Sequence, residues 1–161
     1  MRTKKNHFII WGILLLMFSG TAYAQTTHVV TLYVDTDLLN QGNNKKAYSF
    51  SVSEGTDFSD IEDPEAFTIF VNENDEVEWE AESSSGEEVN IEEIEILDDL
   101  QNPNRKDLFK SKKLNGNRNN DHSKKKVKAK IKSNTKDNVY KYIIRFSLEG
   151  NTYEIDPKIR V

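Results

Sequence analysis

The chain has 161 residues, a formal charge of −5 and no cysteine. Its two methionines, Met1 and Met17, both lie within the first 24 residues. The lack of cysteine excludes disulfides, thiolate nucleophiles, iron–sulfur clusters and cysteine-ligated metals. Packing alone must therefore stabilise the fold.

The N-terminal segment follows the plan of a secretory signal peptide. A start with three basic residues precedes an apolar run at residues 8–18, and Ala-Tyr-Ala occupies residues 22–24. A transmembrane helix needs about 20 apolar residues, and a lipoprotein anchor needs a cysteine where Gln25 stands. We therefore expect cleavage after Ala24, no stable membrane insertion afterwards, and a secreted or periplasmic protein.

The remaining 137 residues carry a formal charge of −8, because residues 1–24 contain three basic residues and no acidic one. This length suits one domain rather than two. Apolar and polar residues alternate with period two through most of it, which is typical of half-buried strands. We expect strands at residues 29–34, 47–52, 67–71, 76–82, 89–97, 127–132, 140–148 and, after a turn at 149–151, at 153–161. About seven short strands separated by turns predict an all-β protein, an antiparallel β-sandwich with Greek-key connections, in a single domain over residues 25–161.

Charge is segregated along the chain. Residues 54–99 contain 19 acidic residues and no Lys or Arg. Residues 101–126 are rich in Lys and Asn, have few large apolar side chains, and are predicted to form a long exposed loop of local charge +7. Its basic residues are the candidates for binding a polyanion: Arg105, Lys106, Lys110, Lys112, Lys113, Arg118, Lys124, Lys125 and Lys126. The alternative, which we favour, is that they neutralise the acidic part of the same chain.

Two histidines remain after residue 24, His28 and His122. A blue-copper site needs two His and a Cys, so copper electron transfer is excluded. Neither histidine lies on a segment expected to hold it rigidly against a Ser and an Asp, so we interpret both as surface residues and expect no catalytic triad. No pair among the 27 acidic residues has a spacing that singles it out for glycoside hydrolysis.

Calcium prefers carboxylate oxygens. Two clusters of acidic residues are weak candidates to bind it: Asp35 with Asp37, and Asp57 with Asp60, Glu62 and Asp63. Neither has the spacing of an EF-hand loop, and we interpret both as turn-forming, solvated carboxylates. We expect no metal and no cofactor.

Three segments carry a family resemblance. Residues 34–39 read Val-Asp-Thr-Asp-Leu-Leu, residues 74–85 combine an Asp-x-Val-x-Trp strand with a Ser-rich turn, and residues 155–161 contain Asp156-Pro157 near the end of the chain. In order and position they resemble the AidA/PixA inclusion-body protein family. That resemblance implies a β-sandwich of cupredoxin-like topology without established catalytic residues. Four residues match the family motifs: Asp35, Asp37, Asp156 and Pro157. We interpret them first as residues that end strands and form turns, and only second as binding residues.

In a cupredoxin-like order, the strand containing Trp79 lies beside the strand at 127–132. The glutamates of the first would then share an outward face with the lysines of the second, and Trp79 would be buried with Val77 and Ala81.

The leading functional hypothesis is an exported, non-enzymatic β-sandwich module that works by binding or association, including self-association, with an unknown ligand. Two alternatives remain open: a polyanion-binding protein that uses the Lys-rich loop, and a calcium-dependent glycan-binding or adhesin-like module that uses the acidic clusters. Polyanion binding would weaken steeply with salt, whereas calcium dependence would appear as a melting shift that a chelator reverses.

Overall fold

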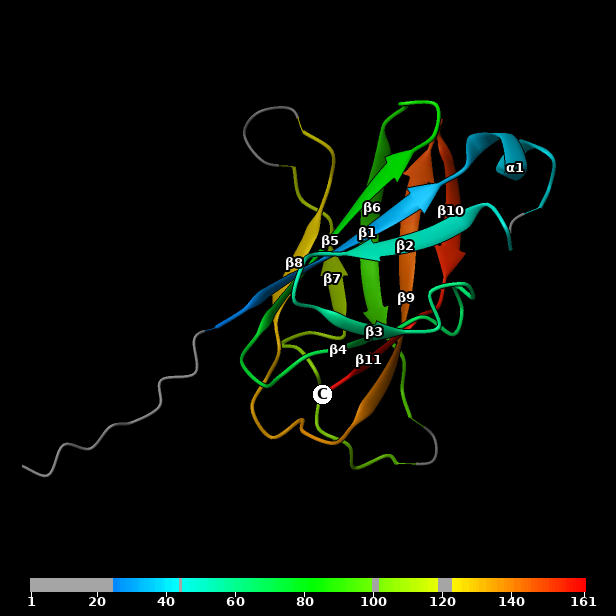
Figure 1. Cartoon of the computed structure of the whole chain (residues 1–161). Coiled ribbons are helices and arrows are strands. Elements are labelled where there is room, and N and C mark those ends of the chain that lie inside the picture. The colour runs from blue at the N-terminus through cyan, green and yellow to red at the C-terminus, as the bar shows by residue number, and fades with distance from the viewer. Residues whose placement is uncertain (1–24, 44, 100–101, 119–122) are drawn as a thin grey trace, which may run out of the picture.

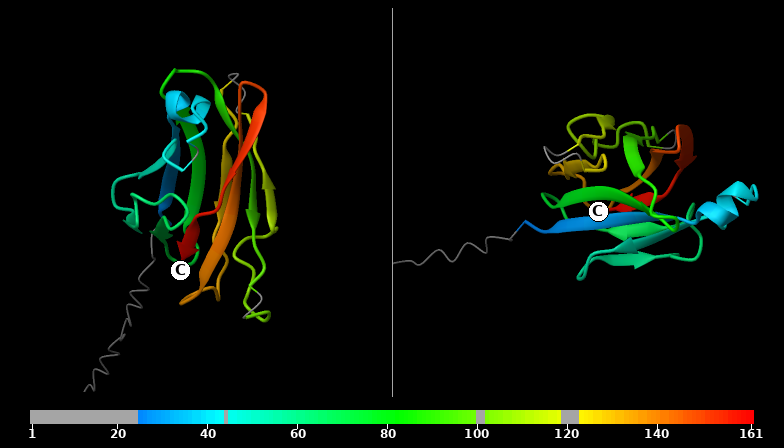
Figure 2. Two further views of the ribbon diagram at one scale, coloured as in Figure 1. Left: turned by 90° about the vertical axis from the view of Figure 1, so that its right-hand side faces the viewer. Right: turned by 90° about the horizontal axis from the view of Figure 1, so that it is seen from above.

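The computed structural model describes residues 25–43, 45–99, 102–118 and 123–161. The expected signal peptide and His122 lie outside these described residues. Two β-sheets pack face to face, as Figures 1 and 2 show. This confirms the predicted β-sandwich. Among the described residues no helix is long and apolar enough to cross a membrane.

The first sheet has the strand order β2-β1-β5-β8. Its strands are β1 (Thr27–Val34), β2 (Tyr48–Val52), β5 (Glu76–Ser83) and β8 (Val127–Lys130). β1 pairs antiparallel with β2 but parallel with β5, and β5 pairs antiparallel with β8. All four strands were expected from the alternation of their side chains.

The second sheet has the order β3-β4-β11-β9-β6-β7, and β10 also pairs with β9. Its strands are β3 (Asp57–Ser59), β4 (Thr68–Phe70), β6 (Val89–Ile96), β7 (Lys113–Asn115), β9 (Val139–Leu148), β10 (Asn151–Ile155) and β11 (Lys158–Arg160). β4 and β11 are parallel. The sandwich is therefore mixed rather than purely antiparallel, and the expected last strand is divided at Asp156-Pro157 into β10 and β11.

A short helix, α1 (Thr36–Asn40), follows β1. Asp35 caps it, because its carboxylate accepts the backbone N–H of Leu38 at 3.0 Å. Near the end of the chain, the backbone carbonyl of Pro157 accepts the N–H of Tyr142 at 3.1 Å. Asp35 thus lies directly after β1, and Pro157 lies between β10 and β11.

The core lies between the sheets and centres on Trp79. Val77, Trp79 and Ala81 are buried on the inner face of β5, as predicted. The ring centroid of Trp79 lies 5.7 Å from that of Tyr142 on β9 and 5.8 Å from that of Phe109, both in edge contact. The indole N–H of Trp79 donates to the Tyr142 hydroxyl at 3.2 Å, and burial raises the pKa of that hydroxyl far above its ordinary value.

The predicted pairing of β5 with β8 is confirmed. Glu76 lies opposite Lys130, and Glu78 lies opposite Lys128. Lys126 bonds both Glu78, at 3.2 Å, and Glu80, and these hydrogen bonds raise the pKa of its ammonium group. The neighbouring strands therefore face each other with opposite charges, which favours this register.

The prediction of an exposed loop over residues 101–126 is wrong in part: many of its described residues are exposed, but Leu108 and Phe109 are buried and residues 113–115 form β7. Leu108 and Phe109 are buried and fill the core beside Trp79. β7 pairs with β6, and Gly116 passes so close to β6 that a Cβ on it would lie 1.8 Å from the Ile91 carbonyl oxygen. The two apolar side chains and this close approach hold the segment against the sandwich.

Candidate binding groove

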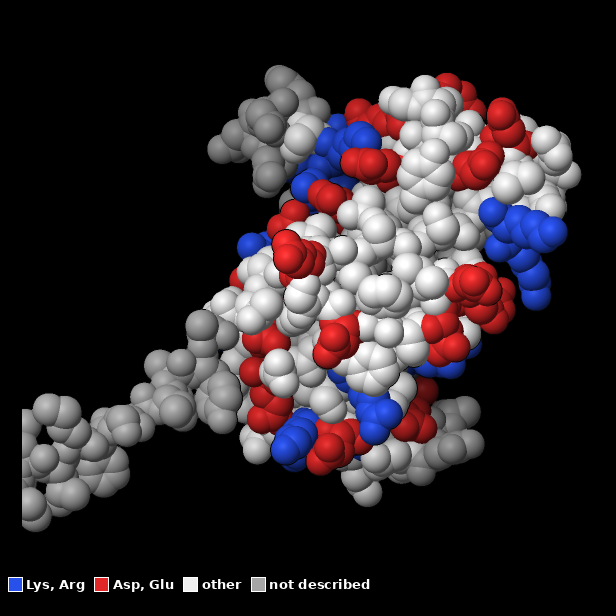
Figure 3. Space-filling view, viewed as in Figure 1, with Lys and Arg blue, Asp and Glu red and all other residues white. Residues whose placement is uncertain are grey.

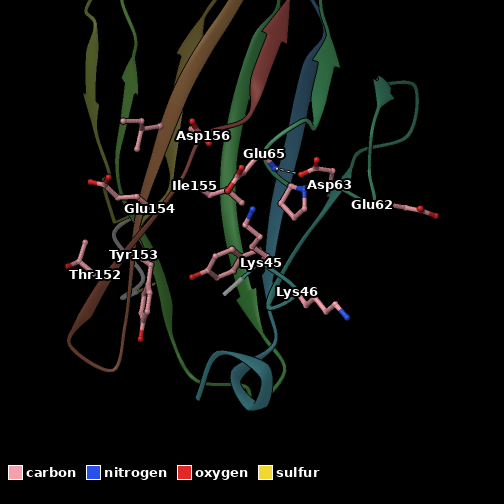
Figure 4. A pocket seen from close by; sticks show the side chains of 13 residues that line it. Lys45, Lys46, Glu62, Asp63, Glu65, Thr152, Tyr153, Glu154, Ile155 and Asp156 are labelled. Atoms are coloured by element: carbon pink, nitrogen blue, oxygen red, sulfur yellow. Dashed lines mark hydrogen bonds between the residues drawn. The ribbon is translucent and has the colours of Figure 1, made fainter. Parts of the chain in front are cut away.

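A groove of about 720 Å³ lies along one side of the sandwich, between the edge strands β2 and β10. Figure 4 shows its walls. Lys45, Lys46 and Tyr48 line it at the start of β2, residues 62–65 line it from the β3–β4 connection, and residues 152–156 line it from β10. Ile143 on β9 completes the lining, so four segments of the chain meet at one site.

Tyr48 and Tyr153 contribute aromatic rings to the groove, beside the apolar side chains of Pro64, Ile143 and Ile155. Tyr48 contacts Phe146 edge to face with a centroid distance of 5.5 Å, and Phe146 stacks on Tyr153 at 5.4 Å. Tyr48 is nearly buried, whereas Tyr153 is half-buried. Burial and the neighbouring Tyr153 raise the pKa of the Tyr48 hydroxyl. The Tyr48 hydroxyl therefore remains neutral at physiological pH.

The charged residues of the groove divide into two groups. Glu154 pairs with Arg145, and Asp156 pairs with Lys141, so these carboxylates are matched by cations on β9. Glu62, Glu65 and the two lysines are exposed and make no ion pair with a described residue, whereas Asp63 accepts the backbone N–H of Glu65 at 3.1 Å. The groove can therefore offer both signs of charge to a ligand.

The prediction that His28 is a surface residue is wrong. Its side chain is buried, with Nδ1 2.9 Å from the Thr56 hydroxyl and Nε2 3.1 Å from the Asp75 carboxylate. Burial alone would raise the pKa of Asp75, but the hydrogen bonds from His28 and from the backbone N–H groups of Thr26 and Asn72 hold it below its usual value. This buried network joins β1 to the turn before β5.

A chain of groups like Asp75, His28 and Thr56 is also found in enzymes that activate a hydroxyl nucleophile. Here all three residues are at most 7% exposed, and the Thr56 hydroxyl also lies 3.1 Å from that of Ser53. The groove is lined by none of them. The network therefore links the start of β1 to the turn before β5 and lies apart from the groove.

The structure does not bring the weak calcium candidates together around one point. Asp35 caps α1, Asp57 lies exposed on β3, and Asp60 accepts the hydroxyl of Ser59. Within the part of the chain that the structure describes, no three His, Asp or Glu side chains are grouped so as to hold a metal ion. Asp37 lies in the first turn of α1, and of these candidates Glu62 and Asp63 line the groove.

Most of the polyanion candidates face carboxylates of the same chain. The pairs are Arg105 with Asp99, Lys112 with Asp98, Lys113 with Glu93 and Glu95, Arg118 with Glu88, Lys125 with Glu92, and Lys126 with Glu78 and Glu80. Lys124 approaches the Ala81 carbonyl oxygen at 3.4 Å, and Lys106 and Lys110 are exposed. This arrangement favours neutralisation within the chain, while polyanion binding stays a prediction.

Sequence reasoning missed the groove because its residues form no local motif. Tyr48 and Tyr153 had been placed on strands by their alternation, but nothing in either segment indicates that β2 and β10 approach each other. Only the packing of the two sheets brings them to one site.

The fold is similar to that of a solved structure. The crystal structure of the inclusion body protein PixA from Burkholderia cenocepacia J2315 matches with a TM-score of 0.64, over 88% of this chain and 98% of PixA, at 10% sequence identity. At this identity the likeness concerns the fold. No protein-family model matches the chain, and no curated protein matches its sequence. The fold thus agrees with the resemblance that the three sequence motifs carry.

Proposed function

We propose that this chain is an exported, non-enzymatic member of the PixA-like proteins that works by association with other copies of itself. The observation that carries the proposal is the match to the fold of an inclusion body protein across nearly the whole of both chains. The motifs at residues 34–39, 74–85 and 155–161 support the same relationship. We include in the proposal the cupredoxin-like strand order that this resemblance implies.

The side-chain chemistry agrees with a role that does not involve catalysis. The one described cluster that resembles a catalytic set, His28 with Asp75 and Thr56, is buried and fully hydrogen-bonded. The groove, by contrast, offers rings, hydroxyls and exposed charges, which are groups that bind.

The test of association is the molar mass of the protein starting at Gln25, which contains all the described strands. We expect sedimentation velocity and light scattering to show species larger than a monomer whose share grows with protein concentration. A chain that stays monomeric at every concentration, in both low and moderate salt, would contradict self-association.

Export is the second part of the proposal. It is supported by the basic start, the apolar run at 8–18 and Ala-Tyr-Ala at 22–24. Mass spectrometry of the protein recovered from the periplasm or the medium should find a chain that begins at Gln25. An intact N-terminus on a membrane-retained protein would refute export.

The groove favours a second candidate function, the binding of an oligosaccharide. A half-exposed tyrosine beside hydroxyl and carboxylate groups can stack on a sugar ring and bond its hydroxyls. The test is binding of a panel of soluble neutral oligosaccharides, with and without chelator, to the protein and to Tyr153→Ala. The matched control is Tyr33→Ala, since Tyr33 is exposed but does not line the groove. Binding lost only in Tyr153→Ala would support this function, and loss on chelation would add calcium dependence.

A further inference from the structure

β2 differs from every other strand with a free edge in the described part of the sandwich. The other edge strands each carry charge: Asp57 on β3, Lys113 on β7, Lys128 and Lys130 on β8, and Glu154 on β10. β2 reads Tyr-Ser-Phe-Ser-Val and contains no charged residue and no proline. Charges on an edge keep other strands away, and β2 lacks that protection.

Exposed apolar side chains gather near this edge. Of the four large hydrophobic residues found exposed, Tyr33, Phe58 and Ile61 belong to β1, β3 and the turn after β3. Tyr33 lies opposite Ser49 in the β1–β2 ladder, and Phe58 contacts Phe67, which stacks on Phe50 at 4.4 Å. The surface over β1 and β2 in Figure 3 is largely uncharged. A strand added to β2 would therefore be bordered by an apolar surface.

The backbone of β2 is ready to accept another strand. The N–H of Asp35 donates to the Ala47 carbonyl at 2.8 Å, and the N–H of Ser53 donates to the Val29 carbonyl at 2.9 Å. Bonded residues alternate along an antiparallel pair, so residues 47, 49, 51 and 53 bond β1. Tyr48, Phe50 and Val52 direct their N–H and C=O groups away from β1, toward the free edge.

We propose that two copies of this chain pair through β2, antiparallel and about a two-fold axis at Phe50, so that the two four-stranded sheets become one continuous sheet of eight. This inference rests on the proposed function and names the surface that carries it. It is supported by the register: in the only two-fold alignment that overlaps the whole of β2, Tyr48 lies opposite Val52 of the second copy and Phe50 lies opposite itself. The outward backbone N–H and C=O groups of these three residues then form hydrogen bonds with the second copy.

Charge and side-chain complementarity support a second copy as the occupant. In the same register Ser49 lies opposite Ser51 of the second copy, so no like charges meet. Continued past the strand ends, the register brings Lys46 toward Glu54 of the second copy, and the symmetry repeats this contact. Both residues are exposed, and neither forms an ion pair with a described residue. A surface that matches itself in this way suits a closed two-fold dimer.

The register can be tested by disulfide trapping, because the chain has no cysteine of its own. Ser49 and Ser51 of the second copy would form a non-hydrogen-bonded pair with Cα atoms about 4.5 Å apart, within the range for a disulfide. Mixing Ser49→Cys with Ser51→Cys under mild oxidation should give a linked dimer that joins the two variants. Thr152→Cys, on the free edge of β10, is the matched control and should not link to either.

Absence of the mixed dimer, or equal linkage to Thr152→Cys, would overturn the β2 pairing. Either outcome would rule out pairing through β2 even if the protein forms large assemblies by another surface. Conversely, a trapped β2 dimer without larger species at high concentration would support the pairing and contradict assembly beyond the dimer.

Charge variants provide an independent readout. Ser49→Lys combined with Ser51→Lys sets lysines opposite each other, and we expect the dissociation constant of the dimer to rise at least about tenfold while the melting temperature of the isolated chain is kept. Lys46→Glu and Glu54→Lys should each weaken dimerisation, and the two together should restore it. Dimerisation unaffected by the lysine pair, with no rescue in the double variant, would contradict the inference.

Discussion

The two outer strands of the first sheet, β8 and β2, present opposite kinds of edge. β8 carries lysines that pair with the glutamates of β5, and Lys126 just before it bonds Glu78 and Glu80. β2 has serines on its outward face and no charge. The comparison shows that one sheet can carry charges that favour one register at one edge while its opposite edge strand has no charge, which is the edge that the proposed dimer uses.

The largest expected effect concerns the core beneath the β8 edge. Trp79→Ala removes a fully buried side chain that contacts Phe109 and Tyr142, and should lower the free energy of unfolding by about 3–5 kcal/mol. Urea denaturation measures this. Tyr142→Phe removes only the hydroxyl that accepts the Trp79 N–H, and should cost about 1–3 kcal/mol. If Trp79→Ala lowered the free energy of unfolding no more than Tyr142→Phe does, the packing around Trp79 would not stabilise the sheet that ends at β8.

The next effect concerns the junction of the two central strands. Asp75→Asn weakens the hydrogen bonds that link Asp75 to His28, Thr26 and Asn72, and should cost about 1–3 kcal/mol at neutral pH. Because folding lowers the pKa of Asp75, its stabilising contribution is present above the unfolded pKa of about 4 and is lost as the pH falls through the folded pKa.

The stability difference between the protein and Asp75→Asn should therefore shrink in acid. Unfolding by urea at neutral pH and at about pH 3 measures the change. Asp60→Asn is the control, since Asp60 is exposed and, among the described residues, its carboxylate bonds only the neighbouring Ser59 hydroxyl. A difference that stayed constant between the two conditions would show that ionised Asp75 does not stabilise the junction.

The ion pairs at the β8 edge should contribute less. Lys126→Ala should lower the free energy of unfolding by about 0.2–1 kcal/mol at low salt, because the side chain is one-third exposed, and the loss should diminish as salt screens the pairs. Lys110→Ala, at an exposed lysine without an ion pair to a described residue, should be neutral. Equal losses of stability in Lys126→Ala and Lys110→Ala would show that the ion pairs of Lys126 do not stabilise the β8 edge.

The smallest effect is expected on polyanion binding. The described basic residues near β8 are largely matched by glutamates, so heparin should retain the protein weakly, and replacing Lys124, Lys125 and Lys126 by Ala should alter retention little at moderate salt. Chromatography at several salt concentrations tests this. Strong retention that is lost in the triple variant would instead identify the basic segment as a binding surface.

Prediction from sequence succeeded where the signal was local. Alternation along residues 76–82 and 127–132 correctly gave two half-buried strands, and their opposite charges agree with the observed pairing of β5 and β8. The short strands β3 and β7 were not predicted, because three residues are too few to establish a period. His28 was misplaced, because its burial depends on Thr56 and Asp75, which come from other segments.

The groove and the free edge of β2 could not be predicted from local sequence patterns. Tyr48 and Tyr153 meet only because the two sheets stack with β2 and β10 on the same side. The buried position of Phe109 likewise depends on space left beside Trp79.

The sequence by itself determined which side chains of the regularly alternating strands face inward, since a strand's period of two assigns successive residues to opposite faces. It also determined the absence of cysteine chemistry and the segregation of charge. Only the tertiary structure decided which strands are neighbours, that β1 lies parallel to β5, and that β2 ends the sheet with its hydrogen-bonding groups free. Strand pairing is a contact between distant segments, and the free energy that selects it comes from packing the whole core.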